Sequence, residues 1–109
     1  MDTQAGRHPV SDNPSLTVGV LTLWLHIPGS LSLKEKRGRI KPLIARIHRE
    51  FNVSAAEVDH HDAWQDAVIA CSAVSNDATH TRQVLQQVLR WVETNWMDVE
   101  VTSEAIEIR

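Results

Sequence analysis

The sequence is poor in residue types that mark several classes of protein. It has one cysteine, no tyrosine and one phenylalanine in 109 residues. The single cysteine, Cys71, cannot form an internal disulfide, and its position in an apolar run predicts a small buried side chain in a reducing compartment. No apolar run approaches membrane-spanning length, and no glycine-rich phosphate loop or nucleophile elbow occurs. We therefore expect a cytoplasmic protein with no membrane contact, no cofactor, no identifiable small-molecule substrate and no enzymatic activity.

The length and composition predict one domain preceded by a tail. A chain of 109 residues with 42% hydrophobic residues can form a single modest core. Residues 1–14 contain two prolines and a glycine but no apolar segment of the kind that forms a secretory signal. We predict a flexible N-terminal tail over residues 1–14 and a single domain over residues 15–109.

Residues 17–27 are rich in β-branched and aliphatic side chains, which predicts a central strand. One set of alternate positions is wholly aliphatic and should face a core covered by helices. The other set mixes apolar and polar side chains, and we expect a second subunit to cover it because it is too apolar to lie wholly in water. The candidate residues of this homodimer interface are Val18, Val20, Trp24 and His26.

The remaining elements are predicted from periodicity and from their end signals. Ser32 and Glu35 have the S-x-x-E spacing of a helix N-terminus, and an apolar stripe at 3.6-residue spacing follows. The apolar parity switches within the last strand, so we expect a bulge or bend near residues 102–105. The expected elements after the first strand are a helix at residues 32–51, an edge strand at 52–59, a central strand at 67–75, a helix at 76–95 and a strand at 98–108.

The order of these elements is βαββαβ. Its common solution is an α+β, ferredoxin-like sandwich, in which a four-stranded antiparallel sheet carries both helices on one face. Domains that recognise single-stranded RNA share this topology and stack bases on aromatic side chains of the sheet. Residues 67–75 contain no aromatic side chain, so such a platform is disfavoured here.

Two sequence patterns carry a resemblance to a known family. Residues 26–37 read H-x-P-G-x-x-S-L-K-x-K-R, and residues 57–65 read E-V-D-H-x-D-x-W-Q. With their surroundings, these patterns resemble the YlxP-like family of uncharacterised small bacterial proteins. The resemblance implies a ferredoxin-like fold in a bacterial cytoplasm and genes that often lie beside those of transcription and translation factors. It implies no established activity.

Charge is distributed unevenly along the chain. Residues 34–49 carry a net +6, whereas the remainder carries −9, giving −3 in total. Such an asymmetry can steer a polyanion to one face of an acidic protein, although long cationic side chains also decorate solvated helices for solubility alone. The candidate nucleic-acid-binding residues are Lys34, Lys36, Arg37, Arg39, Lys41, Arg46 and Arg49.

Two other candidate sites are weaker. The segment at residues 59–62 contains two histidines and two aspartates, but adjacent side chains of an extended segment point apart, so a solvated turn is favoured over a metal site. The turn at residues 28–32 could hold an anion on the free amides of the following helix, but a single glycine favours a plain strand-to-helix turn.

Two functional hypotheses from different classes remain open. The first is a module that docks without catalysis on structured RNA, such as ribosomal RNA, through the basic helix and the turn before it. The second is a structural or small-molecule-sensing homodimer with no role in nucleic-acid binding. Co-sedimentation with ribosomes at low and high salt would distinguish them.

Overall fold

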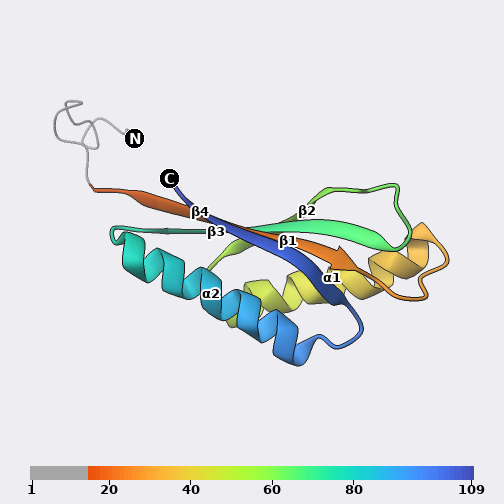
Figure 1. Cartoon of the computed structure of the whole chain (residues 1–109). Helices are drawn as coiled ribbons and strands as arrows, with labels where there is room; N and C mark the ends of the chain where they lie inside the picture. The colour runs from red at the N-terminus through yellow and green to blue at the C-terminus, as the bar shows by residue number, and fades with distance from the viewer. Residues whose placement is uncertain (1–14) are drawn as a thin grey trace, which may run out of the picture.

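The computed structural model describes residues 15–109 as one antiparallel sheet with both helices on one face (Figure 1). The strand order is β2-β3-β1-β4, so β1 and β3 are central and β2 lies at an edge. The predicted ferredoxin-like fold is confirmed, while the predicted tail at residues 1–14 lies outside the described residues. The elements are β1 (Thr17–His26), α1 (Leu33–Glu50), β2 (Ser54–Asp59), β3 (Asp66–Ser75), α2 (Ala78–Asn95) and β4 (Glu100–Ile108).

The alternation of β1 divides the sheet into two faces. Leu21, Leu23 and Leu25 are at most 2% exposed and pair with Cys71, Ile69 and Ala67 of β3, on the side that the helices cover. The other side, which we call the open face, carries no helix (Figure 1). The aliphatic parity of β1 was thus assigned correctly to the core.

Side-chain caps fix where both helices begin. The Ser32 hydroxyl accepts a hydrogen bond from the backbone N–H of Glu35 at 3.0 Å, and the Asp77 carboxylate accepts one from Thr79 at 2.9 Å. Each helix then buries one stripe against the sheet. The stripes are Lys36, Ile40, Leu43 and Ile47 in α1, and Thr81, Leu85, Val88 and Val92 in α2.

A bulge in β4 sets which of its side chains reach the open face. Trp24 pairs with Ser103 and Leu25 pairs with Val101, so Thr102 has no partner position on β1. Its hydroxyl instead donates a hydrogen bond to the Trp24 carbonyl at 3.1 Å. The predicted bulge is confirmed, and it places Val101 toward the helices and Ser103 on the open face.

Candidate functional site

Four of the seven predicted cations of α1 lie free on the surface. Their side chains are exposed, and within residues 15–109 none forms an ion pair or a side-chain hydrogen bond. We call this group the basic surface. It consists of Lys34, Arg37, Lys41 and Arg49.

Two further cations are half-buried and engaged in the fold. Arg39 donates from Nη1 to the Pro28 carbonyl at 2.6 Å and lies 3.6 Å from the Glu35 carboxylate. Arg46 lies 3.4 Å from Glu50, and its guanidinium lies 5.7 Å from the centroid of the Trp91 ring. Both side chains are therefore held by intramolecular partners, and moving either to a ligand would break those contacts.

The seventh cation, Lys36, is not on the surface. It is 1% exposed, and its Nζ donates to Glu57 Oε2 at 3.0 Å and to the carbonyls of His60 and Asp66 at 2.8 and 3.1 Å. All three ammonium donors are thus satisfied, and a carboxylate compensates the charge. The expectation that Lys36 presents a charge to solvent is wrong, because its position on α1 lies on the stripe that faces the sheet.

The two sequence patterns that carry the family resemblance meet at this lysine. Glu57 comes from one pattern and Lys36 from the other, and Gln65 donates from Nε2 to the Ser30 carbonyl at 3.1 Å. The backbone N–H of Ile27 donates to the Gln65 carbonyl at 2.7 Å. These contacts join the turn before α1 to the loop between β2 and β3, so both patterns have a structural role.

Among the histidines and aspartates of residues 59–62, one pair is in contact, His60 Nδ1 with Asp59 Oδ1 at 3.8 Å. His61 contacts the Glu57 carbonyl through Nε2 at 3.2 Å, while His60 takes a positive φ of 59° in the turn. Across residues 15–109, no three His, Cys, Asp or Glu side chains gather closely enough to hold a metal ion. His26 instead pairs with Asp66 at 3.3 Å, which brings one predicted interface residue beside this loop.

The open face is apolar at its centre. All four predicted interface residues lie on it and are half-buried. Val68 is only 4% exposed although no helix covers it, and it is the cross-strand partner of Trp24. Farther along this face, at the level of Val20, lies a hollow of about 270 Å³ that Trp24 does not line. Its lining includes Val20, Ser54, Ala56, Val58, Ala70 and Ser72.

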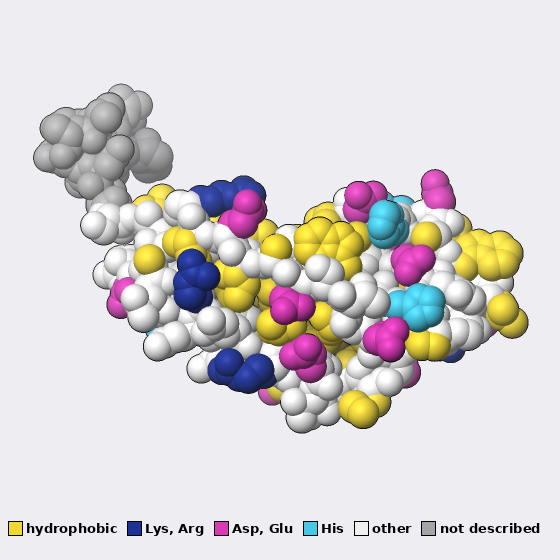
Figure 2. Space-filling view, viewed as in Figure 1, with side chains coloured by type: hydrophobic (Ala, Val, Ile, Leu, Met, Phe, Trp, Pro, Cys, Tyr) yellow, Lys and Arg dark blue, Asp and Glu magenta, His cyan; other side chains and the backbone are white. Residues whose placement is uncertain are grey.

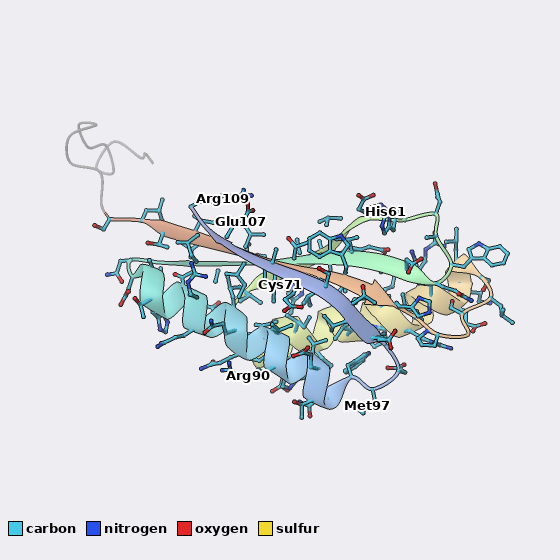
Figure 3. All side chains as sticks on the ribbon, viewed as in Figure 1. His61, Cys71, Arg90, Met97, Glu107 and Arg109 are labelled. Carbon is cyan, nitrogen blue, oxygen red and sulfur yellow. The ribbon has the colours of Figure 1, made fainter. Side chains whose placement is uncertain are left out.

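The two ends of the open face carry different charges. At one end, Arg109 pairs with Glu107 at 2.8 Å, and both side chains rise above the ribbon in Figure 3. At the other end lie Asp66 and Glu100, the two cross-strand partners of His26. Figure 2 shows this face along the upper side, with apolar side chains gathered between an Arg and Glu pair and a group of histidine and acidic side chains.

Cys71 carries no reactive thiol. Its side chain is buried in the core, and burial raises the pKa of the thiol to about 12. A thiol that stays protonated at neutral pH is a poor nucleophile.

Within the part of the chain that the structure describes, neither α1 nor α2 is sufficiently long and apolar to cross a bilayer.

Comparison with known proteins identifies the family. The profile of a family described as "Protein of unknown function (DUF503)" matches residues 18–106. The chain is also similar to a protein of Bacillus subtilis strain 168 that is titled "Uncharacterized protein YlxP", with 38% identity over 63 residues. That alignment covers 58% of this chain and 68% of the relative. The matched range contains both helices and reaches into all four strands. The chain therefore belongs to the DUF503 family, whose function is unknown.

Proposed function

We propose that this protein is a non-enzymatic cytoplasmic module that docks on structured RNA through the basic surface of α1. One observation carries the proposal: four cations of a single helix remain exposed and unpaired after the intramolecular ion pairs of residues 15–109 are taken into account. Exposed cations without intramolecular partners are suited to contact phosphates, because they lose no internal contact on binding.

The spacing of these cations fits an extended polyanion. Lys34, Arg37 and Lys41 are three and four residues apart, so they lie along one side of α1. Arg49 lies farther along, and at ~1.5 Å per residue the group extends over roughly 22 Å. The second helix, in the same layer, adds two exposed arginines, Arg82 and Arg90. The helix layer therefore offers cations over a distance that covers several phosphates.

The contacts expected are with the RNA backbone and not with bases. No Phe, Tyr or Trp occurs in α1, and the ring of its one histidine, His48, accepts a hydrogen bond from the backbone N–H of Ala55 at 2.9 Å, so α1 offers no large aromatic platform for an unpaired base. Duplex RNA is recognised mainly through its shape, its phosphates and its 2′-hydroxyls. We therefore expect binding that does not depend on the nucleotide sequence of the RNA.

The experiment is a salt series measured by fluorescence anisotropy with a labelled ribosomal RNA hairpin. If about four phosphates are neutralised, log K should fall with log salt at a slope of about −3 to −4. Replacing Lys34, Arg37 and Lys41 together with glutamine should flatten that slope by roughly 2 or more. Arg39 is left intact in this variant because it holds the Pro28 carbonyl.

A matched pair of single variants provides the control. Lys41→Gln and Arg109→Gln change the net charge equally, but Lys41 belongs to α1 whereas Arg109 lies at the open face. Only Lys41→Gln should weaken binding. Wild-type protein that fails to bind RNA at low salt, or a triple variant with an unchanged slope, contradicts the proposal. Co-sedimentation with ribosomes at low and high salt extends the test to whole particles.

A further inference from the structure

The open face carries a half-buried indole, Trp24, and a hollow farther along the same sheet. Trp24 lies on β1, and the hollow lies two to four residues back along the same sheet, at Val20 and the neighbouring positions of β3 and β2. Val58 and Val74, also on this face, are 50% and 65% exposed. A face of this kind, with a large aromatic and an apolar depression, has the features of a protein contact surface.

We propose that the open face binds the open face of a second copy of this chain, with Trp24 of each copy filling the hollow of the other. A two-fold axis that runs across the strands at the level of Thr22 reverses the strand direction of the second copy. Position 24 of one copy then lies over position 20 of the other, beside the hollow. The row at the axis is made of small side chains, because Thr22 pairs with Ala70 and Ala105. Small side chains there allow the two sheets to approach to the usual ~10 Å.

The charges at the ends of the open face favour this axis over a two-fold axis that runs along the strands. Reversing the strand direction brings the end with Arg109 over the partner's Glu100, and the same contact occurs twice in the dimer. A two-fold axis along the strands would instead place the acidic end of one copy, with Asp66 and Glu100, over the same acidic end of the other copy. The axis across the strands places each acidic end over the Arg109–Glu107 pair, which has no net charge, whereas the axis along the strands places one acidic end over the other, which repulsion between like charges disfavours.

The size of the face fits a weak but specific dimer. The four strands have ten, six, ten and nine residues, and at ~3.3 Å rise per residue and ~4.8 Å spacing they give a face of roughly 550 Å² per copy. This value lies just under the ~600 Å² per partner of standard specific interfaces, in the range of weak and transient complexes. The hollow is an open depression lined mainly by small side chains and is not an enclosed pocket of the kind that buries most of a drug-sized ligand. A side chain of a second copy is thus a better occupant than a small-molecule effector.

This inference does not depend on RNA binding, and its experiment contains no RNA. Analytical ultracentrifugation of the wild-type chain at 10–100 µM, a range that is on the order of the dissociation constants of weak dimers, should show a concentration-dependent dimer. Trp24→Glu should raise the dissociation constant by at least ~30-fold, because truncated aromatic anchors have effects of this size. Ala56→Glu should have a similar effect by filling the hollow. Because Ala56 is exposed, Ala56→Glu should keep its fold. It therefore tests the dimer even if Trp24→Glu unfolds.

Charge reversal then tests the orientation. Arg109→Glu and Glu100→Arg should each weaken the dimer about 10-fold, and the double variant should recover to within ~3-fold of the wild type. Arg90→Glu is the matched control, because Arg90 lies on the helix side (Figure 3) and its reversal should leave the dimer unchanged. A wild-type monomer throughout the range, or a dimer insensitive to both Trp24→Glu and Ala56→Glu, overturns the proposal. A double variant that dimerises more weakly than either single variant contradicts the proposed two-fold axis.

Discussion

At the scale of single residues, Lys36 shows how a charge can serve the fold. A lone buried ammonium costs several kcal/mol of desolvation, and only a complete set of acceptors offsets this cost. Lys36 has such a set, made of one carboxylate and the carbonyls of the β2–β3 loop. The residue therefore joins α1 to that loop, and its removal leaves Glu57 without its partner.

We predict that Lys36→Met lowers the free energy of unfolding by about 3–5 kcal/mol. Urea denaturation followed by circular dichroism measures the change. The control is Lys41→Met, which is exposed on the same helix and should stay within ~0.5 kcal/mol of the wild type. The double variant Lys36→Met/Glu57→Leu should recover part of the loss, because it removes the orphaned carboxylate as well. A loss of less than 1 kcal/mol in Lys36→Met, well below the ~3–5 kcal/mol expected, would show that the ion pair is not needed.

The sequence contained a partial signal for this burial. Lys36 comes four residues before Ile40, so it continues the apolar stripe of α1 toward the N-terminus. Glu57 alternates with Ala55 on the inward side of β2. Periodicity alone places both residues inward, but only the strand order brings β2 next to α1 and so pairs the two charges. Strand order depends on contacts that are distant in the sequence, which local patterns do not specify.

At the scale of elements, local sequence patterns were sufficient to predict which side of β1 faces the core and where β4 is irregular. The strict alternation of β1 assigned its aliphatic side to the core, and the change of parity in the last strand predicted an irregularity near residues 102–105, which the structure shows as a bulge at Thr102. The basic surface was only partly predictable, because the sequence does not reveal that Arg39 and Arg46 are held by internal partners. Those partners include the Pro28 carbonyl and the Trp91 ring, which lie outside α1.

Two glycines in different elements give opposite predictions for the same substitution. In α1, Gly38 is exposed and a Cβ added there meets no atom within 4 Å, so Gly38→Ala should stabilise the protein by roughly 0.5–1 kcal/mol. In β1, a Cβ added to Gly19 would lie 2.5 Å from Thr81 Cγ2 and 2.8 Å from Leu85 Cδ1 of α2. Gly19→Ala should therefore destabilise the protein by about 1–3 kcal/mol through overpacking.

Thermal unfolding of the two variants beside the wild type measures both effects. The pair is informative because the change in the unfolded chain is the same in each case, so the difference between the variants reports on the folded state. If Gly19→Ala melts at or above the temperature of Gly38→Ala, the close packing of α2 on β1 is wrong.

At the scale of the whole molecule, the two faces of the sheet have separate roles in the proposals made above. The basic surface lies on α1 in the helix layer (Figure 1), whereas the apolar centre lies on the open face (Figure 2). Dimerisation through the open faces would leave both helix layers pointing outward. With ~10 Å for each layer, the two α1 helices would then lie roughly 30 Å apart on opposite sides of the dimer.

This arrangement predicts bivalent binding of RNA. At concentrations where the wild type is dimeric, an RNA with two hairpins joined by a flexible linker that can span roughly 30 Å should bind at least ~10-fold more tightly than one hairpin. Trp24→Glu should bind the single hairpin as the wild type does, because the substitution lies on the other face of the sheet, but it should lose the gain from the second hairpin. Fluorescence anisotropy with both RNAs measures the two quantities in one series. An equal gain in wild type and Trp24→Glu would show that the second hairpin is bound without the dimer, while loss of single-hairpin binding in the variant would show that the two faces are not independent.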